Sequence, residues 1–119
     1  MNLFRMTAMA LAVCLGPLPA GAQPAQPQLD GAVFLREDRL DGLLLSSERF
    51  EVRGTRGTFT SWSTGEGRSV RRCRLEGLVC VINEHLEIQV AADGESVRAV
   101  VRRSDGREHG TSTPMQRAW

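Results

Sequence analysis

The chain contains no lysine and no tyrosine, and it is poor in aromatic residues of every kind. Two tryptophans and four phenylalanines are little material for stacking sugars or bases. The 15 basic residues are all arginine and are almost balanced by 14 acidic residues, so the formal net charge is only +1. A general nucleic-acid binder carries a strong basic excess, and we therefore expect no nucleic-acid partner.

The motifs of catalysis and metal binding are missing as well. The sequence has no G-x-S-x-G, no H-E-x-x-H and no glycine-rich loop that opens a helix. Its two histidines, His85 and His109, fit surface positions near turns better than a converging set of ligands. We predict no catalytic residue, no metal site and no cofactor.

Residues 1–22 have the three parts of a cleavable signal peptide. Arg5 makes the start positive, residues 6–18 are apolar, and Ala20-Gly21-Ala22 is a small-x-small cleavage site. The apolar stretch is shorter than the about 20 residues of a membrane span, so none is expected. Cys14 leaves a lipid-anchored form as an alternative, which the β-branched Val13 disfavours. The sequence thus predicts a periplasmic or secreted protein.

Cleavage after Ala22 leaves enough chain for one small domain. Residues 23–29 are mostly polar and contain proline, which predicts a flexible leader, and residues 30–119 form the predicted single β domain. Two cysteines remain, Cys73 and Cys80, and an even number in an exported chain predicts a disulfide. A turn at Glu76-Gly77 would place the two cysteines directly opposite each other.

From Asp30 onward, short apolar runs alternate with Gly, Asp and Ser, a pattern typical of antiparallel β structure. The strand candidates are 32–35, 50–52, 58–62, 68–74, 78–82, 86–90 and 97–101, with a weak strand at 107–113. About seven short strands without a long helix predict an all-β fold, a small antiparallel barrel or sandwich. The stretch 36–47 stays ambiguous between a helical turn and a strand, because its leucines have helical spacing but Gly42 interrupts them.

The clearest local feature is a hairpin centred on Asp93-Gly94, a preferred type I′ pair. Folding the chain there places all apolar residues of the two strands on one face by pairing Val90 with Val97, Ile88 with Ala99 and Leu86 with Val101. Residues 78–82 are apolar on both faces, which predicts a central strand covered on both sides.

The most unusual feature is the arginine-dense stretch 68–74. Arg68, Arg72 and Arg74 share one strand face, because side chains alternate with a period of two. Residues 58–64 would bring no carboxylate to neutralise them as a neighbouring strand. The pattern predicts a face for an anionic partner such as lipid phosphate, a polyanionic glycan or an acidic protein surface. The alternative is a solvated face, or arginines paired with acids elsewhere.

A small fold without clustered acid–base groups suits binding better than chemistry. We therefore expect a non-enzymatic exported domain that binds a protein or an anionic envelope component. A structural or accessory subunit of an envelope complex is the second hypothesis, and a small hydrolase is the third.

Overall fold

A computed structural model describes residues 27–119, and no helix occurs in this range. The predicted signal peptide and residues 23–26 of the predicted leader lie outside the described residues. The strands are β1 (Val33–Leu40), β2 (Leu43–Arg53), β3 (Arg56–Ser63), β4 (Gly67–Glu76), β5 (Val79–Asn83), β6 (Leu86–Val90), β7 (Ser96–Arg102), β8 (Glu108–Thr111) and β9 (Met115–Arg117). The all-β prediction is confirmed, with more strands than the about seven that we expected.

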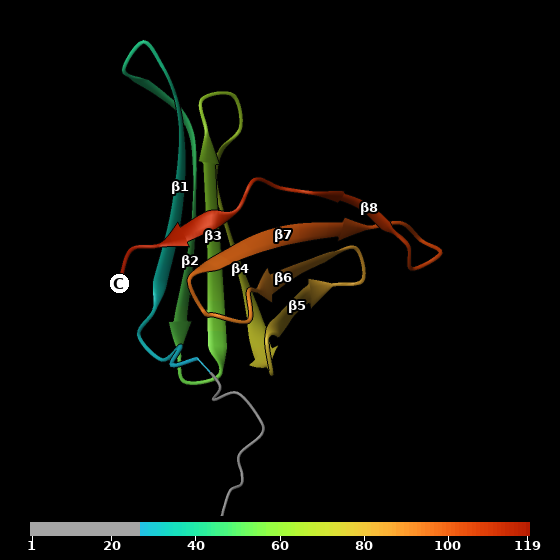
Figure 1. The fold of residues 1–119 in the computed structure, drawn as a ribbon. Coiled ribbons are helices and arrows are strands. Elements are labelled where there is room, and N and C mark those ends of the chain that lie inside the picture. Colours follow the sequence, from blue (N-terminus) through green and yellow to red (C-terminus); the bar gives the residue numbers. More distant parts are fainter. Residues whose placement is uncertain (1–26) are drawn as a thin grey trace, which may run out of the picture.

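The strands close into an antiparallel barrel rather than a sandwich (Figure 1). The order is β6-β5-β4-β3-β2-β1-β9-β7, and β7 pairs back to β6; β8 is an extra strand beside β7. Closure depends on β9, which pairs with Phe34 of β1 through Arg117 and with Val97 of β7 through Met115. This three-residue strand was not predicted, because its sequence is too short for an alternating pattern.

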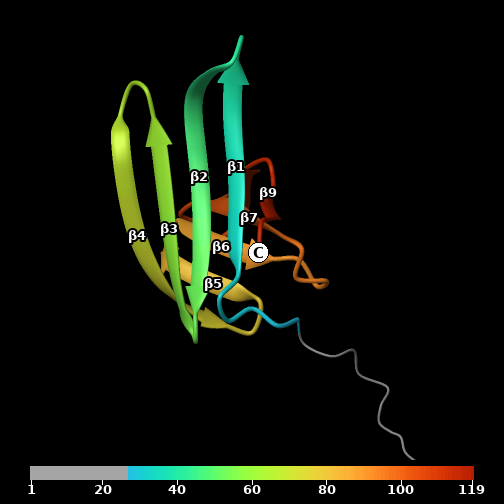
Figure 2. The same ribbon diagram turned by 90° about the vertical axis from the view of Figure 1, so that its left-hand side faces the viewer.

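Strands β1 to β4 are longer than the others and extend beyond the barrel as a projecting sheet (Figure 2). Strand β9 pairs only with Phe34 and Leu35 of β1, and β5 pairs only with Arg74, Leu75 and Glu76 of β4. Residues 36–40 and 67–73 therefore each have a strand neighbour on one side only within the described part of the chain.

The stretch 36–47 is a hairpin, so its strand reading was right and its helical reading was wrong. Leu40 pairs with Leu43 around Asp41 and Gly42, whose φ angles are 51° and 81°. Positive φ at both central residues is the requirement of a type I′ turn, which favours Asp-Gly. The turn chemistry here overrides the helical spacing of the leucines.

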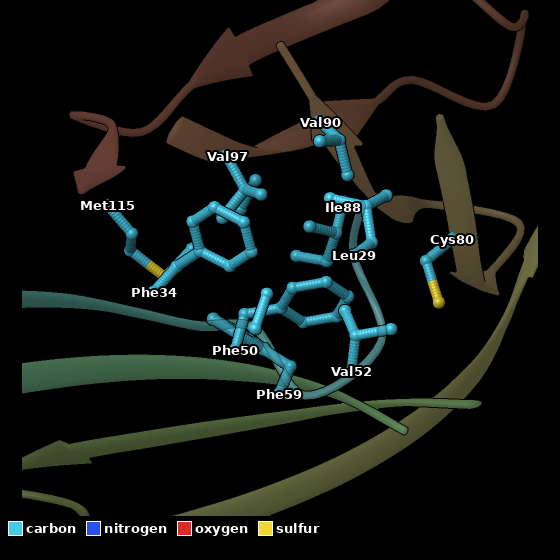
Figure 3. Packing of buried hydrophobic residues seen from close by; sticks show 12 residues of the cluster. Leu29, Phe34, Phe50, Val52, Phe59, Cys80, Ile88, Val90, Val97 and Met115 are labelled. Atoms are coloured by element: carbon cyan, nitrogen blue, oxygen red, sulfur yellow. The ribbon is translucent and has the colours of Figure 1, made fainter. Parts of the chain in front are cut away.

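The core lies between the long strands and the strands that cross them (Figure 3). Phe34 and Phe50 pack with ring centroids 6.3 Å apart, and Ile88, Val97 and Met115 approach from the other side of the barrel. Leu29, which the sequence places in the leader, also packs in this core. Packing of the barrel therefore begins before residue 30.

The predicted register of the β6–β7 hairpin is confirmed at all three pairs, Leu86–Val101, Ile88–Ala99 and Val90–Val97. The predicted type I′ geometry is wrong. A type I′ turn needs a positive φ at Asp93, but among the described non-glycine residues only Asp41 has one. The strands are instead joined by a wider loop, which is closed by the Ala91 N–H donating to the Ser96 carbonyl. Val100 is buried on the opposite face from Val97, so the apolar residues do not all share one face.

The β4–β5 hairpin differs from its predicted register by two residues. Glu76 pairs with Val79, so the turn is Gly77-Leu78, and Cys80 lies opposite Leu75 instead of Cys73. A slip of two residues keeps each side chain on its face, and Cys73 therefore still lies on the same side of the sheet as Cys80. The prediction that 78–82 is covered on both faces is wrong, because Val81 is 56% exposed.

Candidate anion-binding face

The outer face of β3 and β4 gathers arginines from both strands. Cys73 and Leu75 pack against the core, so the alternating residues Arg72 and Arg74 face outward. The register places Arg72 opposite Thr58, and Arg74 opposite Arg56. We call Arg56, Arg68, Arg72 and Arg74 the arginine face.

The structure places the three arginines singled out in the sequence on one face, with Arg72 and Arg74 at one hollow and Arg68 at another. It adds Arg56, which sequence reasoning missed. Arg56 follows the Gly54-Thr55 turn, where Arg53 pairs with Arg56 across a two-residue connection. A glycine in a short polar stretch between two strands is a turn signal. Trp62 pairs with Arg68 and shares its face. Because side chains alternate, Arg56, six residues before Trp62, lies on that face too.

No residue of the arginine face forms an ion pair within residues 27–119. Some of the other arginines are paired, for example Arg36 with Glu48 at 3.0 Å and Arg102 with Glu87 at 2.8 Å, whereas Arg71, Arg98, Arg103 and Arg117 form no ion pair within the same residues. The chain has no Asp or Glu before Asp30, so every carboxylate side chain belongs to the described part. Four arginines without ion pairs on two adjacent strands make the arginine face locally positive, although the charge of the whole chain is almost balanced.

A surface hollow of about 550 Å³ lies within this face. It is lined by Arg53, Arg56, Arg72 and Arg74 and also by Gly57 and Cys73, which are paired across β3 and β4.

One carboxylate, Glu51, also lines the hollow, and it is already engaged. Arg53 Nη2 lies 2.8 Å from Glu51 Oε2, and Arg49 Nη2 lies 3.5 Å from Glu51 Oε1. Glu76 faces outward at the barrel end of β4, beside Val79, where the arginine face stops. Because Arg56, Arg72 and Arg74 form no ion pair within residues 27–119, an anion that enters the hollow would not have to displace a carboxylate from them.

Cys73 and Cys80 link β4 to β5 at the end of the arginine face that adjoins the barrel. Their Sγ atoms are 2.06 Å apart and their Cα atoms 5.5 Å apart, so the two residues lie at the distance of a disulfide. The bond links β4 to β5 at the point where β4 leaves the barrel. Such a link holds the backbone between Arg72 and Arg74 in place.

A second hollow of about 550 Å³ is lined by Arg36, Glu37, Glu48, Arg49 and Arg68, and its two carboxylates are ion-paired with Arg36 and Arg39. The two histidines lie elsewhere. His85 is in the turn between β5 and β6, 3.4 Å from Glu84, and His109 is exposed in β8. Within residues 27–119 no three side chains of His, Cys, Asp or Glu are placed to share a metal ion.

Two carboxyl groups have shifted pKa values, and both shifts lead away from neutrality. Hydrogen bonds from Arg102 and then Gln89 lower the pKa of Glu87, and hydrogen bonds from Arg36 and then Ser46 lower that of Asp38. A general acid at neutral pH needs the opposite shift. Both pairs are therefore structural interactions.

Comparisons with protein-family models, with curated proteins and with solved structures find no match to this chain. The described residues contain no helix that could cross a membrane. Function is therefore inferred from the arginine face and from the chemistry of the chain itself.

Proposed function

We propose that this protein is an exported, non-enzymatic binding domain whose arginine face holds an anionic partner. The observation that carries the proposal is the set Arg56, Arg68, Arg72 and Arg74, which lie on adjacent strands without an ion-pair partner in residues 27–119. Guanidinium groups present planar forks that match carboxylate and phosphate oxygens.

The proposed compartment is the periplasm or the cell exterior. Its support is the signal-like character of residues 1–22 together with the disulfide distance between Cys73 and Cys80. Disulfides persist in oxidising compartments and are rare in the cytosol.

A binding role is favoured over catalysis by the nature of the exposed groups. Arginine stays protonated at all ordinary pH values and neither accepts nor releases a proton in catalysis. Each exposed contact contributes only about 0.5–1 kcal/mol, so we expect weak binding that depends strongly on salt.

The test is retention on immobilised heparin in a salt gradient. The variant carries Arg68→Ser, Arg72→Ser and Arg74→Ser. A matched control carries Arg98→Ser, Arg103→Ser and Arg107→Ser, which removes equal charge from β7 and the β7–β8 hairpin and spares the Arg102–Glu87 pair.

We expect the first variant to elute at clearly lower salt than wild type, and the control to elute close to wild type. Equal elution of the two variants would mean that retention follows net charge alone, and the arginine face would then be a solvated surface.

A further inference from the structure

The arginine face ends at an open strand edge. Only Arg74, Leu75 and Glu76 of β4 pair with β5, whereas residues 67–73 pair with β3 alone within the described chain. Figure 2 shows this part of β4 as the outermost strand of the projecting sheet. An edge of seven residues is about 20 Å long and offers its main-chain groups to another strand.

The free main-chain groups of this edge belong to the residues that carry the arginine face. The Leu75 N–H donates to the Thr55 carbonyl, on the β3 side of β4. Main-chain groups of successive residues point to opposite sides of a strand. The N–H and C=O groups of Arg68, Val70 and Arg72 therefore point to the open side.

The side chains at these three positions have a simple, symmetric pattern. Arg68 and Arg72 flank Val70, which is 46% exposed, and all three stand on the outer face of the sheet. Successive positions on one strand face are about 7 Å apart. A strand added to this edge would bring its own side chains opposite an arginine, a valine and an arginine.

We infer that the anionic partner of the arginine face is an extended, acidic polypeptide segment that adds to the open edge of β4 as a further strand. The inference rests on the proposed function and names its partner. The segment carries an acidic residue, an apolar residue and an acidic residue at alternating positions. Main-chain hydrogen bonds to Arg68, Val70 and Arg72 supply affinity, and the two carboxylates opposite the guanidinium groups supply selectivity.

Charge disfavours a second copy of this chain at the same edge. Two antiparallel β4 edges centred on Val70 would place Arg68 of one copy opposite Arg72 of the other, and like charges directly opposite are destabilising. The chain's own residues before Asp30 contain no acidic side chain, so they lack the chemistry of the proposed segment. The open edge of β1 carries Glu37 and Asp38, but these are ion-paired with Arg39 and Arg36. We therefore assign the carboxylates to another protein.

The experiment uses the processed protein and a capped synthetic peptide, Thr-Glu-Thr-Val-Thr-Glu-Thr. Exchange of individual amide hydrogens is followed by NMR with and without the peptide. We expect the amides of Arg68, Val70 and Arg72 to exchange about tenfold more slowly with peptide. The amides of Ser69, Arg71 and Cys73, which face β3, should change little.

Two control peptides separate the contributions of main chain and charge. A peptide with the same sequence but N-methylated along the edge that faces β4 cannot make the ladder, and it should give no protection. A peptide with Gln in place of Glu tests the carboxylates and should bind several-fold more weakly.

A variant of the protein tests the contribution of the main-chain groups of β4. Val70→Pro removes one edge N–H, and proline is tolerated on an open strand edge. This variant should lose peptide protection while keeping its retention on heparin, and Val70→Thr should keep both.

The outcomes distinguish this inference from the proposed function. Unchanged amide exchange together with equal binding of the N-methylated peptide would overturn strand addition and leave the anionic face intact. Binding to anionic phospholipid vesicles without binding to the peptide would overturn it in favour of a lipid surface. If neither the triple variant nor its control loses retention on heparin, both proposals are overturned.

Discussion

Gly57 lies directly against the sulfur of Cys80. A Cβ atom at Gly57 would lie 2.7 Å from Sγ of Cys80 and 2.7 Å from Cζ of Phe50, closer than side-chain atoms approach. Both neighbours are fully buried, and the sulfur belongs to the Cys73–Cys80 pair. The absence of a side chain at Gly57 therefore lets β3 pass close to the disulfide beneath the arginine face.

The first prediction concerns this contact. Gly57→Ala should lower the free energy of unfolding by about 1–3 kcal/mol, because neither the disulfide sulfur nor the buried ring can move away easily. Urea denaturation followed by tryptophan fluorescence measures the change. The control is Gly65→Ala in the β3–β4 turn, where no atom lies within 4 Å of the added Cβ. A change at Gly65 as large as that at Gly57 would contradict the steric explanation.

The second prediction concerns the disulfide. Thiol titration of the processed, denatured and unreduced protein should detect no free thiol from Cys73 or Cys80. Replacing both with Ala should cost about 2–4 kcal/mol, chiefly because the unfolded chain loses a covalent constraint. Two reactive thiols in protein from an oxidising compartment would count against the bond.

The third prediction concerns the pH dependence of stability. Arg102 donates to both oxygens of Glu87, from Nε at 2.8 Å and from Nη2 at 3.2 Å, and this lowers the pKa of Glu87. As pH falls, the unfolded chain takes up a proton at this residue before the folded chain does. The stabilisation is therefore fully present above the unfolded pKa of about 4.3 and is lost as pH falls through the lower folded pKa.

Glu87→Gln tests this linkage. At pH 7 it should reduce stability by about 1 kcal/mol, and the difference from wild type should shrink as pH falls below about 4.3 and vanish below the lowered pKa of the folded state. Urea denaturation at a series of pH values gives both curves. Glu95→Gln is the control, since Glu95 forms no ion pair among the described residues. A difference that stayed constant down to pH 3 would rule out the carboxylate as its source.

The fourth prediction concerns processing. Exported protein should begin at Gln23, because Ala20-Gly21-Ala22 follows the apolar stretch and Pro17 and Pro19. Intact-mass analysis of the exported protein measures the amino terminus. Retained residues 1–22 would argue against export, and a lipid on Cys14 would replace the soluble form by an anchored one.

The local sequence determined the features that depend on turn chemistry and alternation. The β6–β7 register followed from where the apolar residues Ile88 and Val97 must point, since a slip of one residue would turn them outward. The same rule placed Arg68, Arg72 and Arg74 on one face. The Asp41-Gly42 turn was also present in the sequence, although the spacing of the leucines hid it.

Only the tertiary structure decided the features that depend on distant partners. A slip of two residues leaves every face unchanged, so alternation could not distinguish Leu75 from Cys73 as the residue opposite Cys80. Closure through β9 depends on Phe34 and Val97, which lie far from Met115 in the chain. The open edge of β4 arises in the same way, because a strand cannot encode how far its neighbour β5 continues beside it.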